Sequence, residues 1–176
     1  MTGLTGPTAT GPNQSGPQGE VFFYHLTRAP LEATLPMLLD RSLAQGWRIC
    51  LRGRDARQLE WLDEQLWLRP EDGFLPHGQA GGEHDARQPV LLTTGAEMPN
   101  DANALIAIGG AEVTPEEMRQ LTRVSVVFDG NDPDAVAAAR VQWKEVVAAG
   151  VTAKYWSQEN GPWEMKASAE ASDKEE

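Results

Sequence analysis

The chain has 176 residues, with 26 acidic and 15 basic side chains and a net charge of −11 at pH 7. This length suits about one domain with a sizeable core. The acidic balance argues against broad nucleic-acid binding, which depends on cations that neutralise phosphates, and no apolar run approaches the roughly 18 residues of a membrane span.

The two ends of the chain differ in composition from its centre. Residues 1–19 are Gly, Pro, Thr, Ser, Gln and Asn with almost no apolar side chain, and residues 167–176 are polar and acidic. We therefore expect two disordered tails around one α/β domain at residues 20–166. The first residues lack the basic and apolar parts of a secretory signal, and the lone Cys50 cannot form an internal disulfide, so a reducing cytoplasm is expected.

Between the tails, short apolar runs alternate with helical patterns. The runs predict strands at 21–26, 47–51, 89–93, 104–108 and 123–128, with a last short one at 151–156. The helical patterns lie at 30–45, 55–68, 114–121 and 132–150. Pro36 falls inside the first helical pattern, where it would delay the start of the helix or kink it. This alternation predicts a three-layer, doubly wound α/β fold, a mostly parallel sheet flanked by helices as in nucleotide-binding proteins.

Two of these helices carry further local signals. In the helix at 55–68, Leu59, Leu62 and Leu66 recur at the spacing of a core-facing stripe. In the helix at 114–121, Thr114 and Glu117 have the spacing of a capping box.

The pattern at 132–150 has the clearest ends. Asp132 is placed to cap the first backbone N–H groups, Pro133 suits the first helical position, and Gly150 suits the position after the last turn. The predicted apolar stripe consists of Val136, Ala139, Trp143 and Val147.

Beside that stripe, Arg140 and Lys144 lie one turn apart, next to Trp143. Two cations beside an aromatic ring form a candidate site for an acidic partner. The alternative is that Trp143 belongs to the core and the cations only keep the helix edge solvated, and spacing alone favours this alternative.

The usual catalytic signatures of such a fold are missing. The turn after the first strand, residues 27–30, is not glycine-rich, and the sequence has no P-loop and no nucleophile elbow. His77 and His84 share a Gly-rich stretch with acidic residues, but their spacing matches no metal motif. Asp129 ends the fifth strand, where a carboxylate more often begins a turn. We expect no cofactor, no metal and no catalytic residue, as in a binding module.

One segment resembles a known family. The run LDEQLWLRP at 62–70, followed by FLPH at 74–77, is similar to the D-E-x-L-W-x-x-P and F-[LIV]-P-H segments of the chi subunit of bacterial DNA polymerase III. The aromatic first strand and the R-x-x-[aromatic]-K segment at 140–144 agree in order. The resemblance covers about residues 20–156.

The resemblance implies a non-catalytic accessory subunit of the clamp loader with two contact surfaces. Trp67 and Phe74 match positions that contact the psi subunit, or a repair helicase that competes with psi. Arg140, Trp143 and Lys144 match the site for the acidic C-terminal tail of single-stranded DNA-binding protein. For Trp67, core packing remains an equal alternative.

The leading hypothesis is therefore a replication adaptor that links the clamp loader to single-stranded DNA-binding protein. The alternative is a small α/β nucleotide-binding enzyme that uses the loops at the carboxyl ends of its strands. Direct DNA binding is a third hypothesis, against which the acidic composition argues.

Overall fold

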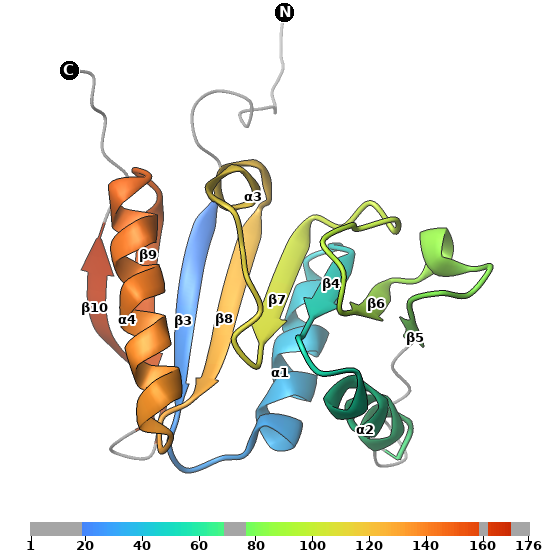
Figure 1. Cartoon of the computed structure of the whole chain (residues 1–176), viewed down its shortest axis with the longest axis horizontal. Helices are drawn as coiled ribbons and strands as arrows, with labels where there is room; N and C mark the ends of the chain where they lie inside the picture. The colour runs from blue at the N-terminus through green and yellow to red at the C-terminus, as the bar shows by residue number, and fades with distance from the viewer. Residues whose placement is uncertain (1–18, 69–76, 159–161, 170–176) are drawn as a thin grey trace, which may run out of the picture.

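One twisted sheet forms the centre of the chain in the computed structural model, which describes residues 19–68, 77–158 and 162–169 (Figure 1). Its strands follow the order β10-β9-β3-β8-β7-β4-β6-β5. They are β3 (Glu20–Leu26), β4 (Ile49–Arg52), β5 (Gly78–Gln79), β6 (Val90–Thr93), β7 (Ala104–Ile108), β8 (Arg123–Asp129), β9 (Thr152–Ser157) and β10 (Glu164–Ala169). Among the described pairings, β10 runs antiparallel to β9 and all the others are parallel.

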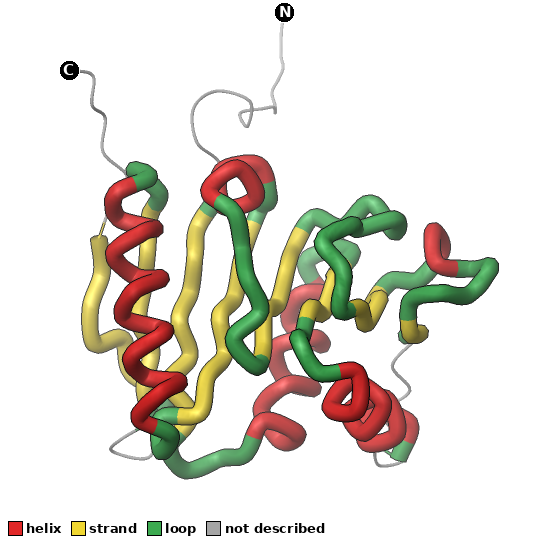
Figure 2. Tube along the Cα trace, viewed as in Figure 1, coloured by secondary structure: helices red, strands yellow, loops and turns green. Residues whose placement is uncertain are grey.

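The helices cover both faces of this sheet. They are α1 (Leu31–Ala44), α2 (Ala56–Trp67), α3 (Pro115–Gln120) and α4 (Pro133–Ala148), with a short 3₁₀ turn, η1, at Asp85–Arg87. Side chains of α1 and α2 join one hydrophobic core, and those of α3 and α4 join a second core on the opposite face. Figure 2 shows the helices and strands of this arrangement in separate colours. The predicted three-layer, doubly wound architecture is confirmed.

Strands β4, β6 and β7 are buried along their whole length because both faces of the sheet are covered there. Along β4, Ile49 and Leu51 pack into the α1–α2 core, whereas Cys50 points to the opposite core. Burial raises the pKa of the Cys50 thiol to about 11, so the thiol stays neutral at physiological pH. Cys50 is thus a small core residue.

Most predicted elements form within a few residues of their expected bounds, and the helix ends have the predicted chemistry. The side chain of Thr114 accepts from the N–H of Glu117 at 3.1 Å, and Glu117 accepts from the N–H of Thr114 at 3.0 Å, which completes the capping box. The predicted core stripe of α2, from Leu59 to Leu66, is buried. Of the two effects expected at Pro36, the late start is wrong, because α1 already begins at Leu31 and continues through Pro36.

Three local predictions need correction. Val147 is 43% exposed, and α4 instead buries the neighbouring Val146 together with Ala139. The two-residue β5 was not predicted, and neither was β10. The domain boundary expected after residue 166 falls inside β10, so the fold extends to Ala169. Apart from Gly19 and β10, the two expected tails lie outside the described residues.

No helix in the described part of the chain is long and apolar enough to cross a lipid bilayer.

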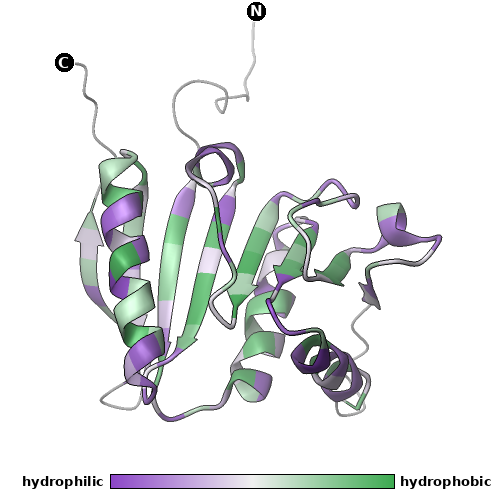
Figure 3. Ribbon diagram, in the orientation of Figure 1, coloured by the Kyte–Doolittle hydropathy of each residue, from purple (hydrophilic) through white to green (hydrophobic). Residues whose placement is uncertain are grey.

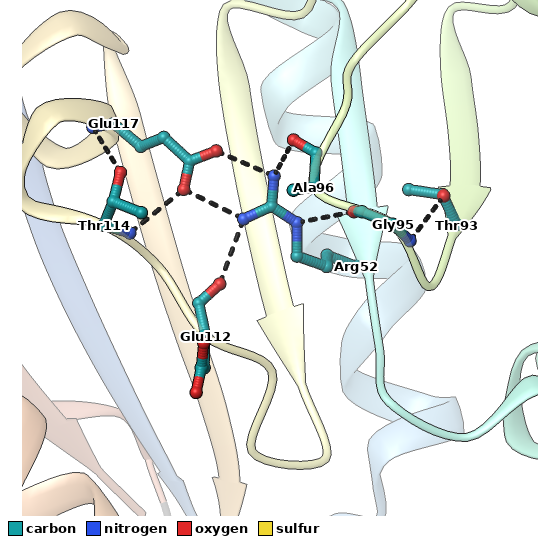
Figure 4. A network of polar contacts seen from close by, with 7 residues as sticks. All are labelled: Arg52, Thr93, Gly95, Ala96, Glu112, Thr114 and Glu117. Carbon is teal, nitrogen blue, oxygen red and sulfur yellow. Dashed lines mark hydrogen bonds and ion pairs between the residues drawn. The ribbon is translucent and has the colours of Figure 1, made fainter.

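A buried ion pair joins β4 to α3 (Figure 4). The guanidinium of Arg52 donates to both carboxylate oxygens of Glu117, at 2.9 and 2.8 Å. It also donates to the backbone oxygens of Gly95, Ala96 and Glu112, at 2.9–3.1 Å. These five bonds use every N–H of the guanidinium, so the charge of Arg52 is fully compensated inside the fold.

Acid is expected to weaken the fold through Glu117. Burial alone would raise the pKa of this carboxyl, but the hydrogen bonds from Arg52 and Thr114 outweigh it and hold the pKa below the ordinary value of 4.5. The carboxylate therefore stabilises the fold above the unfolded pKa, and this contribution is lost as pH falls through the folded pKa. Urea unfolding between pH 7 and pH 3 should show a declining free energy of unfolding. In Glu117→Gln that decline should be smaller, and an equal decline in both chains would contradict the assignment.

Candidate functional site

The helix α4 begins and ends as its sequence predicts. The carboxylate of Asp132 accepts from the N–H of Asp134 at 3.0 Å, Pro133 occupies the first turn, and Gly150 follows the helix with φ of +76°. The helix packs against β8 and β9. Its sixteen residues therefore present one long side to solvent, on which Figure 3 shows hydrophobic and hydrophilic stretches alternating.

Trp143 lies at the border between the core and this outer side. Its ring meets Phe23 at 5.5 Å between centroids and Tyr155 at 6.0 Å, both with an edge toward a face. The residue is half-buried. The core interpretation of Trp143 is thus partly right, because strands β3 and β9 fix the ring while part of it stays at the surface.

Arg140 and Lys144 are both exposed on the turns beside Trp143. Within the described residues, neither makes an ion pair or a side-chain hydrogen bond. Their positive charges are therefore available to an acidic partner, although the chain as a whole has a net charge of −11. Val147, one turn beyond Trp143, adds an exposed apolar surface. Together the four residues offer positive charge for a carboxylate and an apolar contact for a ring.

Tyr155 and His25 support this site and were not found from the sequence. The hydroxyl of Tyr155 lies 2.6 Å from Nδ1 of His25, and the Tyr155 ring packs between Phe128 and Trp143. Both residues come from strands, so they share no spacing with α4 that a sequence pattern would reveal.

The second predicted surface lies at the end of α2. Trp67 is 55% exposed, so its core alternative is wrong. The centroid of its ring lies 4.6 Å from that of the buried His77 ring. Nε2 of His77 in turn lies 3.1 Å from a carboxylate oxygen of Asp63. Leu68 follows with 74% exposure, so two large apolar side chains face solvent together. Phe74 lies outside the described residues.

The two surfaces are far apart on the fold. α4 covers β8 and β9 on one face of the sheet, whereas α2 packs on the opposite face and contacts β5 and β6 near the other edge (Figure 1). The two surfaces therefore do not overlap.

A cavity of about 730 Å³ lies at the carboxyl ends of β3 and β8, where the chain turns to α1 on one face and α4 on the other. In open α/β sheets, ligands commonly bind in a crevice at this place. Here Arg28 and Arg54 share the lining with Asp129, Asp132 and Asp134, so the acidic groups would repel a phosphate. Asp129 accepts from the N–H of Asn131 at 2.9 Å, which is the turn role that the sequence favours.

The metal alternative gains no support from the geometry. His77 pairs with Asp63, and the exposed His84 lies 3.8 Å from Glu83. Within the described residues, no group of three or more His, Cys, Asp and Glu side chains is arranged to hold a metal ion.

Comparison with known protein families covers most of the described chain. The family described as "DNA polymerase III chi subunit, HolC" matches residues 19–154, well over half of the chain. The chain belongs to the chi subunit family of DNA polymerase III. Chi is a non-catalytic accessory subunit of that polymerase, so the family gives this chain a role in DNA replication.

Two curated relatives carry the same family name. A probable DNA polymerase III subunit chi from Rickettsia prowazekii is 22% identical over 111 residues, which are 60% of this chain and 67% of the relative. The DNA polymerase III subunit chi from Pseudomonas aeruginosa is 34% identical over 89 residues, which are 49% of this chain and 61% of the relative. The match thus spans less than two thirds of the Pseudomonas protein.

A solved structure is also similar in part. The C-terminal domain of a possible DNA helicase from Lactobacillus plantarum WCFS1 superposes with a TM-score of 0.45 at 15% identity, covering 67% of this chain and 78% of that domain. A score this low carries no argument about function. The chi match includes Trp67, Arg140, Trp143 and Lys144, whereas β10 lies beyond it.

Proposed function

We propose that this chi family member is a replication adaptor. It binds the psi subunit of the clamp loader through the end of α2, and the acidic C-terminal tail of single-stranded DNA-binding protein through α4. A repair helicase competes with psi for the α2 surface. The adaptor works in the cytoplasm with the rest of the polymerase, and holds the clamp loader near coated template.

The observation that carries this proposal is the pair of cations on α4. A tail that ends in acidic residues, an aromatic ring and a free carboxylate needs a cation for the carboxylate and an apolar surface for the ring. Arg140 can hold a carboxylate with two parallel N–H bonds, and Lys144 adds a second positive charge. Trp143 and Val147 offer the apolar surface. Because the charges are exposed, binding should be micromolar and salt-sensitive.

The exposure of two apolar side chains at the end of α2 supports the proposed psi surface. Trp67 is 55% exposed and Leu68 is 74% exposed at the end of α2, and large apolar side chains of this kind often dominate a protein interface. Since the two surfaces lie on opposite faces, psi and the tail can bind together. Two weak contacts joined in this way raise the effective concentration of one partner near the other.

Binding of a fluorescent peptide with the sequence of the acidic tail tests the proposal. We expect micromolar affinity for the intact chain, measured by anisotropy, and a loss of about tenfold or more in Arg140→Ala, because a charge-assisted hydrogen bond contributes about 1.5–3 kcal/mol. Raising the salt concentration should weaken binding further.

Arg57→Ala is the matched control, because Arg57 is an exposed arginine on α2 and its loss changes the net charge equally. Equal affinity of Arg140→Ala and Arg57→Ala for the peptide would contradict the site. Retention by the chain of a single-stranded DNA-binding protein that lacks its tail would contradict the proposed partner contact.

A further inference from the structure

A pocket of about 290 Å³ lies on the α1 face of the sheet, away from both surfaces described above. One wall is α1, and the floor is formed by β3, β8 and β9. Its aromatic lining consists of Phe22, Tyr24, Trp47, Trp156 and Trp163. Four of these rings form a connected set, in which Phe22 lies 6.1 Å from Trp156 and Tyr24 lies 5.4 Å from Trp163 between centroids. Five aromatic residues around one pocket offer several ring faces to a planar ligand.

The pocket is positively charged although the chain is acidic. Arg41 and Arg123 line it, and among the described lining residues there is no Asp or Glu. The guanidinium carbon of Arg123 lies 3.8 Å from the centroid of Phe22, so its charge is held against the ring. Outside the lining, Glu20 approaches Arg123 at 3.2 Å, which leaves the exposed Arg41 as the uncompensated cation.

Two buried N–H groups of the lining residues are without an acceptor. Nε of Arg123 and Nε1 of Trp156 are both buried, and neither donates to any atom of the described chain. Buried donors are nearly always paired in proteins, and an unpaired one costs about 1–3 kcal/mol. Because both residues line the pocket, a small shift of either side chain would bring its N–H to an acceptor atom of a bound ligand.

We propose that this pocket binds one nucleobase together with its phosphate, presented by single-stranded DNA or by a free nucleotide. A base is planar, stacks on aromatic rings, and carries acceptors on its edge, and its phosphate suits Arg41. The pocket has room for about one base. A one-nucleotide contact also agrees with the acidic composition, because it neutralises one or two phosphates rather than many.

This pocket is independent of the adaptor proposal. Trp156 and Trp163 follow residue 154, where the chi family match ends, and the tail site lies on the opposite face of the sheet. The inference therefore does not rest on binding of the acidic tail, and either proposal can fail alone.

The test uses the full chain and a fluorescent strand of eight thymidines at low salt, with binding measured by anisotropy. We expect saturable binding that weakens about tenfold in Trp163→Ala and about threefold or more in Arg41→Ala, as expected for one lost base stack and one lost phosphate contact. Trp61→Ala and Arg57→Ala are matched controls, since both residues are exposed on α2, and their affinities should be unchanged. Arg41 is exposed on α1, so its variant keeps the test valid if Trp163→Ala folds poorly.

Indole N–H signals in an NMR spectrum locate the site directly. The chain has six tryptophans, and the signal that disappears in Trp156→Phe belongs to Trp156. This signal should shift on addition of the strand, whereas that of Trp61 should not. Competition then distinguishes the sources: thymidine monophosphate that displaces the strand assigns the pocket to free nucleotides, and displacement by unlabelled strands alone assigns it to single-stranded DNA.

Three outcomes would overturn the proposal. One is the absence of saturable binding by the intact chain, and another is equal affinity in pocket and control variants. The third is an acidic aromatic peptide that shifts the Trp156 signal while the strand does not, which would assign the pocket to a protein partner.

Discussion

Replacing Arg52 by alanine should destabilise the fold by about 3–5 kcal/mol, a large share of the stability of a domain this size. Removing one partner of a buried pair leaves the other charge without compensation. Here Glu117, which is only 16% exposed in the intact chain, would face an empty guanidinium site, with its hydrogen bond to Thr114 as the main remaining contact. Three backbone oxygens, at Gly95, Ala96 and Glu112, would also lose their donor.

Lysine should not rescue this position. An ammonium group has three donors on a single nitrogen, whereas Arg52 makes five hydrogen bonds in a planar fork that matches the carboxylate of Glu117. We therefore expect Arg52→Lys to lose most of the stability that Arg52→Ala loses. Unfolding in urea, followed by circular dichroism, measures both.

Arg54→Ala is the control, because Arg54 lies two residues further along the chain and is exposed, so its loss should change stability by less than about 0.5 kcal/mol. A second comparison separates charge from packing. Arg52→Met combined with Glu117→Gln should be less destabilising than the sum of the two single changes, because both partners of the pair are then neutral. Equal costs for Arg52→Ala and Arg54→Ala would show that the ion pair adds nothing to stability.

The elements that the sequence predicts well are those with local signals. The ends of α4 at Asp132 and Gly150, and the capping box of α3, depend on residues within one turn of each other, and the structure has each of them. The apolar strands are recognisable because both faces are buried. Neither signal extends across the sheet, so the sequence does not predict the strand order. It also does not predict the ion pair between Arg52 and Glu117, because these two residues are 65 positions apart.

The errors have local causes as well. α4 carries alanines on several sides, so its periodicity does not fix one stripe, and the helix buries Val146 instead of Val147. The strand β10 has no apolar run, and it forms by pairing with β9 across an irregularity between Met165 and Ala167. Its composition resembles the polar residues that follow it, so the predicted boundary came too early.

The candidate site also has one part that the sequence predicts and another that only the structure shows. Arg140, Trp143 and Lys144 are three and four residues apart, so helical geometry alone brings them together. What holds the ring of Trp143, namely Phe23 and Tyr155, comes from strands and needed the structure. For Trp67, periodicity left core and surface equally open, because a residue in the last turn of a helix can face either side, and only the fold shows it exposed.

Trp67→Ala should weaken binding of psi by about thirtyfold or more, because truncation of an aromatic hot spot costs at least about 2 kcal/mol. The ring is mostly exposed in the free chain, so the free energy of unfolding should change little, apart from its contact with His77. Trp61→Ala is the matched control: Trp61 is an exposed tryptophan on the same helix, at 42%, and matches no proposed contact. Calorimetric titration with purified psi measures all three chains.

The same variants test whether the chain acts as an adaptor. Because α2 and α4 lie on opposite faces of the sheet, Trp67→Ala should leave binding of the tail peptide unchanged, and Arg140→Ala should leave binding of psi unchanged. Psi and the peptide should then bind one chain together, with each affinity unaffected by the other partner. If psi displaced the peptide, the two surfaces would be one site in function, and the chain would choose between its partners instead of linking them.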